Sequence, residues 1–167
     1  MFLRALLLAV TATTVMAGSA AAQNVRLLGD YRDWSSYAAA DATGPVCFAM
    51  TKPKQVSPQP DGYTEGSLYI TNRPGENVAN EFNLVAGFTF APDSAATVNV
   101  SGQVFNLFTQ NDAAWLDDAG QSATLASAIR AGSTMVVEGT SAAGIKITET
   151  FSLSGATAAS QAMTDCK

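Results

Sequence analysis

The sequence predicts an all-β, mainly antiparallel domain, a β-sandwich or a small closed barrel, with two short helices in its C-terminal half. Apolar and polar residues alternate in short runs, as they do in a strand that buries one face. Loops rich in proline, glycine and aspartate separate these runs, and both helical patterns come late in the chain. The 167 residues leave room for one such domain.

The first 22 residues are predicted to form a secretory signal peptide. Arg4 precedes an apolar run over residues 5–16, and Ala20-Ala21-Ala22 supplies small residues at the cleavage position. The run is shorter than the ~20 apolar residues of a membrane-spanning helix. We therefore expect cleavage before Gln23, a single domain over residues 23–167 without a transmembrane span, and a periplasmic or secreted location.

The first half of this domain is expected to contain five strands, of which the first has the weakest pattern. They lie at residues 25–28, 33–39, 46–51, 67–72 and 80–88. The longest loop between them, residues 53–66, contains three prolines and has no apolar periodicity. We expect this loop to be exposed and mobile.

The second half is expected to contain two hairpins. The first turns at Ser101-Gly102-Gln103, between apolar positions in 98–100 and 105–107. The second joins residues 134–140 to residues 145–153.

Two helices complete the expected elements. Leu125 and Ile129 lie four residues apart within 122–131, and Gly132 follows as a stop signal. The second helix is the alanine-rich stretch 155–165.

The composition excludes several classes of function. With 9 Lys and Arg against 14 Asp and Glu, the net charge is −5, so the chain lacks the basic face that nucleic-acid binding needs. The chain has no histidine, which removes the serine–histidine and cysteine–histidine relays and the HExxH zinc site. We predict no enzymatic activity, no cofactor and no metal site.

The only two cysteines, Cys47 and Cys166, permit one intramolecular pairing. In an exported chain a disulfide is the default, and two free or intermolecular thiols are the alternative. A bond between them would close a loop of most of the domain and contribute up to ~5 kcal/mol in the chain-entropy model.

Glu149 shares a face of its expected strand with Ile147 and Phe151, and this face is expected to be buried. A buried ionised carboxylate is costly unless it is paired and hydrogen-bonded. We expect a partner for it, with Arg73 as the first candidate and Lys52 as the second. The alternative is that a strand edge leaves Glu149 in water.

Arg73 lies at the end of an expected strand, directly before Pro74. We favour a structural role for it, with Glu76 or Glu81 as a nearby carboxylate partner. The alternative is a cation presented to an acidic partner.

Asp117 and Asp118 precede the first helix, where carboxylates cap free amide groups. Together with Asn111 and Asp112 they are a weak alternative as a calcium site.

Trp34 and Trp115 are predicted to be core anchors rather than ligand platforms. For Trp115 this interpretation depends on its apolar neighbours, Phe105, Leu107 and Leu116.

The order and spacing of several short blocks resemble the invasion-associated locus B proteins of alphaproteobacterial cell envelopes. The resemblance covers about residues 34–167, and no single block is a catalytic motif. The blocks are Val46-Cys47-Phe48, Lys52-Pro53-Lys54, Thr71-Asn72-Arg73-Pro74, Glu76-Asn77-Val78, Asn80-Glu81, FNLFTQNDAAW at 105–115, MVVEGTS at 135–141, Ser152-Leu153-Ser154-Gly155 and Cys166-Lys167. This resemblance implies an exported all-β envelope protein, linked in pathogenic members to entry into host cells, and it implies no reaction.

The sequence is compatible with three functions. The leading one is a non-enzymatic envelope protein that recognises a protein or cell-surface partner. The second is a periplasmic carrier of a small molecule or lipid, which would need an internal apolar cavity of at least ~300 Å³. The third, an enzyme that uses carboxylates alone, would need a clustered acid–base pair in a cleft.

Overall fold

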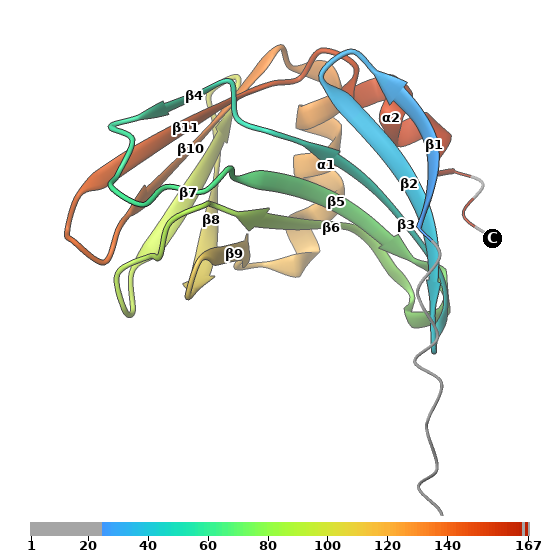
Figure 1. Cartoon of the computed structure of the whole chain (residues 1–167). Helices are drawn as coiled ribbons and strands as arrows, with labels where there is room; N and C mark the ends of the chain where they lie inside the picture. The colour runs from blue at the N-terminus through green and yellow to red at the C-terminus, as the bar shows by residue number, and fades with distance from the viewer. Residues whose placement is uncertain (1–24, 165, 167) are drawn as a thin grey trace, which may run out of the picture.

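The computed structural model describes residues 25–164 and 166, which form a single antiparallel sheet and two α-helices (Figure 1). The order of the 11 strands across the sheet is β1-β2-β3-β5-β6-β9-β8-β7-β10-β11-β4. The expected signal peptide and two residues at the other end, Asp165 and Lys167, lie outside the described residues. The strands are β1 (Arg26–Tyr31), β2 (Trp34–Asp41), β3 (Gly44–Thr51), β4 (Gln55–Ser57), β5 (Ser67–Arg73), β6 (Val78–Val85), β7 (Ala95–Val100), β8 (Gln103–Gln110), β9 (Ala113–Leu116), β10 (Thr134–Thr140) and β11 (Lys146–Ser152).

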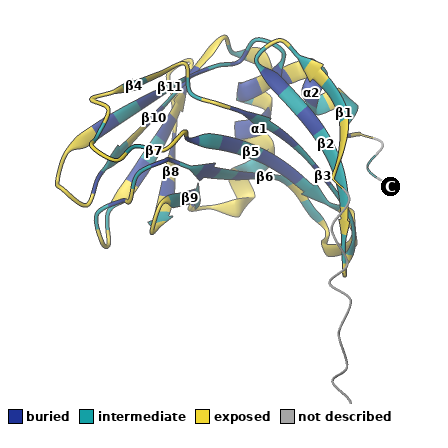
Figure 2. Cartoon of the chain, in the orientation of Figure 1, coloured by how far each residue is buried: buried dark blue, intermediate teal, exposed yellow. Residues whose placement is uncertain are grey.

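The strands form where the sequence alternates, because alternate side chains point to opposite faces of a sheet. In β5, Leu68 and Ile70 are buried, whereas Tyr69 between them is only half-buried. Figure 2 shows this alternation along β5 and β6, which pass in front of helix α1 (Ser122–Ala131). The sheet therefore has an inner face, toward the helices, and an outer face, toward solvent.

The sheet is curved so strongly that the start of β2 contacts the end of β11. Trp34 donates a hydrogen bond from its indole nitrogen to the Ser152 carbonyl at 3.0 Å, and the Asp33 amide donates to the Ser154 carbonyl at 3.2 Å. The all-β, mainly antiparallel class with two short helices in the C-terminal half is confirmed. The sheet is not closed into a barrel, because its order ends in two edges, β1 and β4.

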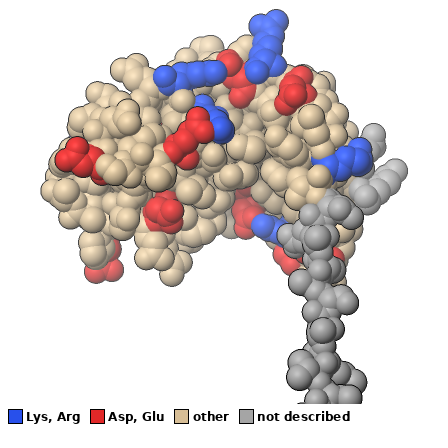
Figure 3. Space-filling model, viewed as in Figure 1, with Lys and Arg blue, Asp and Glu red and all other residues tan. Residues whose placement is uncertain are grey.

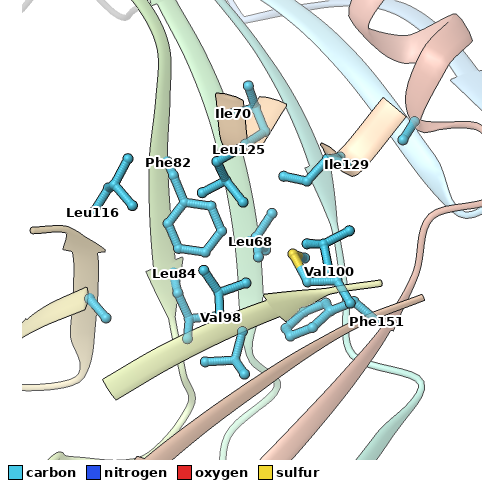
Figure 4. Packing of buried hydrophobic residues seen from close by; sticks show 14 of the residues in the cluster. Leu68, Ile70, Phe82, Leu84, Val98, Val100, Leu116, Leu125, Ile129 and Phe151 are labelled. Carbon is cyan, nitrogen blue, oxygen red and sulfur yellow. The ribbon is translucent and has the colours of Figure 1, made fainter. Parts of the chain in front are cut away.

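Both helices cover the inner face of the sheet (Figure 1). Helix α1 places Leu125 and Ile129 among side chains of β5, β6 and β7, and these fill the interior (Figure 4). Helix α2 (Ala156–Ala162) packs on β1 and β2, where the buried Ser36 hydroxyl donates to the Ala159 carbonyl at 2.8 Å. Burial of each large apolar side chain contributes about 1.5–3 kcal/mol, so this shared interior holds the two ends of the sheet together.

The expected disulfide is present between Cys47 in β3 and Cys166, with a Cα–Cα distance of 5.6 Å. It attaches the segment after α2 to the first half of the sheet. The alternative, in which Cys47 and Cys166 are free thiols, therefore does not hold in the structure.

The largest difference from expectation lies in the loop at residues 53–66. Residues Gln55–Ser57 form β4, which pairs with β11 and becomes an edge of the sheet. The second unexpected strand is β9, which lies between β6 and β8. Helix α1 has the expected bounds, and α2 is shorter than expected. Among the described residues, neither helix combines the length and hydrophobicity that membrane crossing requires.

Candidate functional site

The outer face of six neighbouring strands carries a row of aromatic side chains. The strands are β2, β3, β5, β6, β9 and β8, in that order. Each strand contributes one residue to the row, and this residue is aromatic in every strand except β6. The residues of this aromatic row are Tyr37, Phe48, Tyr69, Asn83, Trp115 and Phe108.

Strand register produces this row. Tyr37 lies directly opposite Phe48, Tyr69 lies opposite Asn83, and Asn83 lies opposite Trp115, which in turn lies opposite Phe108. Each of these six positions alternates with a buried residue on the same strand, so all of them face outward. Phe108 has 47% of its surface exposed, and the other four rings are half-buried.

The rings contact one another across the strands. Tyr37 and Phe48 are stacked with centroids 5.1 Å apart, and Phe48 meets Tyr69 at 6.1 Å in a tilted arrangement. Trp115 stacks on Phe108 at 5.4 Å. Such aromatic pairs stabilise the positions of the rings by more than the burial of their surface alone would. The aromatic row is therefore a preformed platform.

A groove crosses the aromatic row at Asn83, where a ring is missing. The groove has a volume of about 440 Å³. Phe48 and Tyr69 form one wall and Trp115 forms the other. The outer groove is lined by Val46, Phe48, Tyr69, Thr71, Arg73, Glu81, Asn83 and Trp115.

The two charged side chains of the outer groove neutralise each other. The Arg73 guanidinium donates to a carboxylate oxygen of Glu81, across the β5–β6 pair. The two side chains are 31% and 37% exposed, so the pair is partly desolvated. Of the two carboxylates expected near Arg73, Glu81 is its partner, whereas Glu76 lies exposed in a 3₁₀ turn (Pro74–Glu76).

The prediction that Trp115 is a core anchor is wrong. In β9 the inward positions belong to Ala114 and Leu116, so strand alternation directs Trp115 outward. Trp34 is 2% exposed and is the core residue that was expected. The other four aromatic residues of the row were not predicted as site residues from the sequence; they are Tyr37, Phe48, Tyr69 and Phe108. Their common signal is an aromatic residue at the outward position of an alternating strand.

Glu149 is buried as expected, with 1% of its surface exposed, but its expected ion pair is absent. Arg73 is bound to Glu81 and Lys52 is bound to Glu65, which explains why neither reaches it. The Tyr63 hydroxyl donates to one carboxyl oxygen at 3.4 Å, and the other oxygen has no partner among the described residues. Desolvation raises the pKa of Glu149 to about 8, against the lowering effect of the Tyr63 hydrogen bond.

The remaining candidate residues have structural surroundings. Asp118 caps the turn before α1 by accepting a hydrogen bond from the Gly120 amide at 2.9 Å. The hydrogen bond with Glu65 raises the pKa of Lys52. Within the described part of the chain, no group of three or more Cys, Asp or Glu side chains is arranged to hold a metal ion.

Comparisons with known proteins place these features in context. A family described as "Invasion associated locus B (IalB) protein" has a model that matches residues 34–164. The fold is similar to the crystal structure of invasion associated protein B from Bartonella henselae, with a TM-score of 0.55. That match has 16% sequence identity and covers 78% of this chain and 91% of the other. No curated protein matches the sequence.

Proposed function

Because this chain belongs to the invasion associated locus B family, we propose that it is an extracytoplasmic recognition protein that binds a partner on the aromatic row. The observation that supports this proposal most is the row itself, because five aromatic rings lie on the solvent side of the sheet. Contiguous exposed aromatic surface on a soluble domain is typical of a binding site.

The aromatic row suits recognition because its side chains are already ordered before a partner binds. The rings are fixed by stacking within a continuous sheet, so few side-chain rotamers would be lost on binding. Glu81, which is the one carboxylate that the described residues contribute to the outer groove, is bound to Arg73. We propose no chemical step for this face.

The carrier function has less support than recognition. A carrier of the kind considered would hold its cargo in an apolar interior. Here the space between the sheet and the helices is filled by side chains from both (Figure 4). Phe82, Leu84 and Phe151 are among the fully buried residues that occupy it.

Binding of the purified protein to isolated bacterial envelopes and to cultured animal cells tests the proposal. We expect Trp115→Ala and Phe48→Ala to weaken this binding by about tenfold or more, which corresponds to about 1.4 kcal/mol. Ile145→Ala is the matched control, because Ile145 is 43% exposed and lies outside the aromatic row. Thermal unfolding of each variant checks that the fold is intact.

Equal binding by the wild type and both aromatic variants would rule out the aromatic row as the recognition surface. An equally large loss of binding in Ile145→Ala would also contradict the proposal. Binding would then depend on exposed apolar surface in general and not on the aromatic row.

A further inference from the structure

We propose that the ligand of the outer groove is a neutral glycan, with one pyranose ring held between the aromatic walls over Asn83. This inference rests on the proposed recognition function and names the chemical class of the partner. Three features of the outer groove support it: its spacing, its mixed lining and its neutral charge.

The spacing of the walls suits a single ring. Phe48 and Tyr69 stand on one side, Trp115 stands on the other, and the short polar side chain of Asn83 lies between them. Tyr69 and Trp115 belong to strands on either side of β6, so two strand steps of about 4.8 Å each separate the strands that carry the two walls. The step from one strand to the next is close to the length of one pyranose unit in an extended glycan. A glycan that crosses the strands would therefore meet successive rings of the aromatic row.

The lining of the outer groove is half aromatic or aliphatic and half polar, which matches the two sides of a pyranose. A pyranose ring presents C–H groups on its faces and hydroxyl groups around its rim. The negative π face of an aromatic ring attracts polarised C–H groups. Thr71, Asn83 and the Arg73–Glu81 pair offer donors and acceptors for the hydroxyl groups.

These polar groups are held in place. The Asn83 amide nitrogen donates a long hydrogen bond of 3.4 Å to the Ala114 carbonyl, and the side-chain oxygen of Asn83 is the atom that can accept a hydrogen bond from a ligand hydroxyl group. Arg73 and Glu81 fix each other through their ion pair. A ligand hydroxyl group would therefore meet oriented partners, which favours directional recognition over general hydrophobic adhesion.

The charge of the outer groove favours a neutral ligand. The charged side chains in its lining, Arg73 and Glu81, form a pair, so the described residues give the groove no uncompensated charge. The whole chain has a net charge of −5, which would repel an anionic glycan or a phosphate group. Figure 3 shows charged side chains that are scattered and separated by wide uncharged areas on the face that includes β5 and β6.

Titration with soluble oligosaccharides tests the inference, with the change in tryptophan fluorescence as the readout. Trp115 lies in the outer groove and Trp34 is buried, so a ligand in the groove changes the signal of Trp115. Neutral gluco-, manno- and N-acetylglucosamine oligomers form the first arm, anionic polyuronate oligomers form the second, and a proline-rich peptide forms the third. Calorimetry measures the same binding in variants that lack Trp115.

We expect saturable binding of at least one neutral oligomer, with weaker binding of the anionic oligomers. Trp115→Ala and Phe48→Ala should weaken it about tenfold or more, whereas Trp115→Phe should restore a large part of the affinity. Asn83→Asp keeps the size of the side chain but adds a negative charge and removes two donors, so it should weaken binding as well. Ile145→Ala should bind as the wild type does.

The possible failures separate this inference from the proposed function. If no neutral oligomer binds but Trp115→Ala still abolishes binding to cells or envelopes, the recognition function stands and the glycan inference is wrong. Preferential binding of the peptide or of the anionic oligomers would overturn the glycan inference in the same way. If the aromatic variants bind cells as the wild type does and no oligomer binds, both proposals fail.

Discussion

Glu149 is a carboxyl group in the interior of the sheet, and its ionisation is coupled to folding. Desolvation raises its pKa to about 8 from an ordinary value of 4.5. Between these two pH values the folded protein keeps a proton that the unfolded chain has lost. Unfolding then releases a proton, so the free energy of unfolding falls as the pH rises from about 4.5 to about 8, by roughly 1 kcal/mol per pH unit.

We predict that Glu149→Gln removes this contribution. The variant should match the wild type in stability near pH 4.5 and exceed it by a few kcal/mol at pH 8, as measured by urea unfolding over this pH range. Glu138→Gln is the control, because Glu138 lies exposed on the neighbouring strand β10. Parallel stability curves for the wild type and Glu149→Gln would show that Glu149 is not the uncharged, buried group described above.

Trp115 and Glu149 show what the sequence can predict for a single residue. The burial of Glu149 follows from alternation along a seven-residue strand, β11, which is long enough to assign each position to a face. Its surroundings do not follow from alternation, because Tyr63 approaches from a distant loop. Strand β9 has only four residues, so its alternation is too short to separate Trp115 from its apolar neighbours.

At the scale of the elements, Gly155 determines how α2 starts. Gly155 has a φ of +99°, and a Cβ atom at this position would overlap the Tyr31 carbonyl of β1. We predict that Gly155→Ala lowers the free energy of unfolding by about 3 kcal/mol, since it adds backbone strain and displaces α2 from β1. Chemical denaturation measures the change.

Gly144→Ala is the matched control for this prediction. Gly144 has a φ of +76°, but a Cβ atom there would meet open space. Its substitution should cost about 1 kcal/mol, from backbone strain alone. Equal losses in the two variants would show that the contact between Gly155 and Tyr31 does not constrain α2.

The elements that the sequence predicts well are those whose signals are local. Helix α1 has the expected bounds because Leu125 and Ile129 face the core and Gly132 ends the pattern. Strand β4 was missed because it has three residues, is followed by Pro58 and owes its pairing to β11, which is distant in the sequence. A strand that depends on a distant partner has no periodicity of its own to detect.

At the scale of the whole molecule, the disulfide links two segments that are 119 residues apart. We predict that Cys47→Ser with Cys166→Ser lowers the free energy of unfolding by up to about 5 kcal/mol, because the unfolded chain regains the entropy of that loop. Urea unfolding without reductant measures the loss.

Reduction of the wild type should produce the same loss, and reduction of the double variant should change nothing. An unchanged unfolding midpoint after complete reduction of the wild type would contradict the prediction that the bond stabilises the domain.

The order of the sheet divides the chain into two consecutive blocks. Strands β1, β2, β3, β5 and β6 are neighbours and come from the first half of the sequence, and β9, β8, β7, β10 and β11 follow from the second half. The short strand β4 is the exception, because it comes from the first half and pairs with β11 at the far edge. A ribosome delivers the first block early, with the edge of β6 unpaired and its inner face uncovered. Such an edge is prone to intermolecular pairing, and non-local pairings form slowly. Newly made chains would therefore need protection, such as a holding chaperone, until α1 and the last hairpin arrive to complete the sheet.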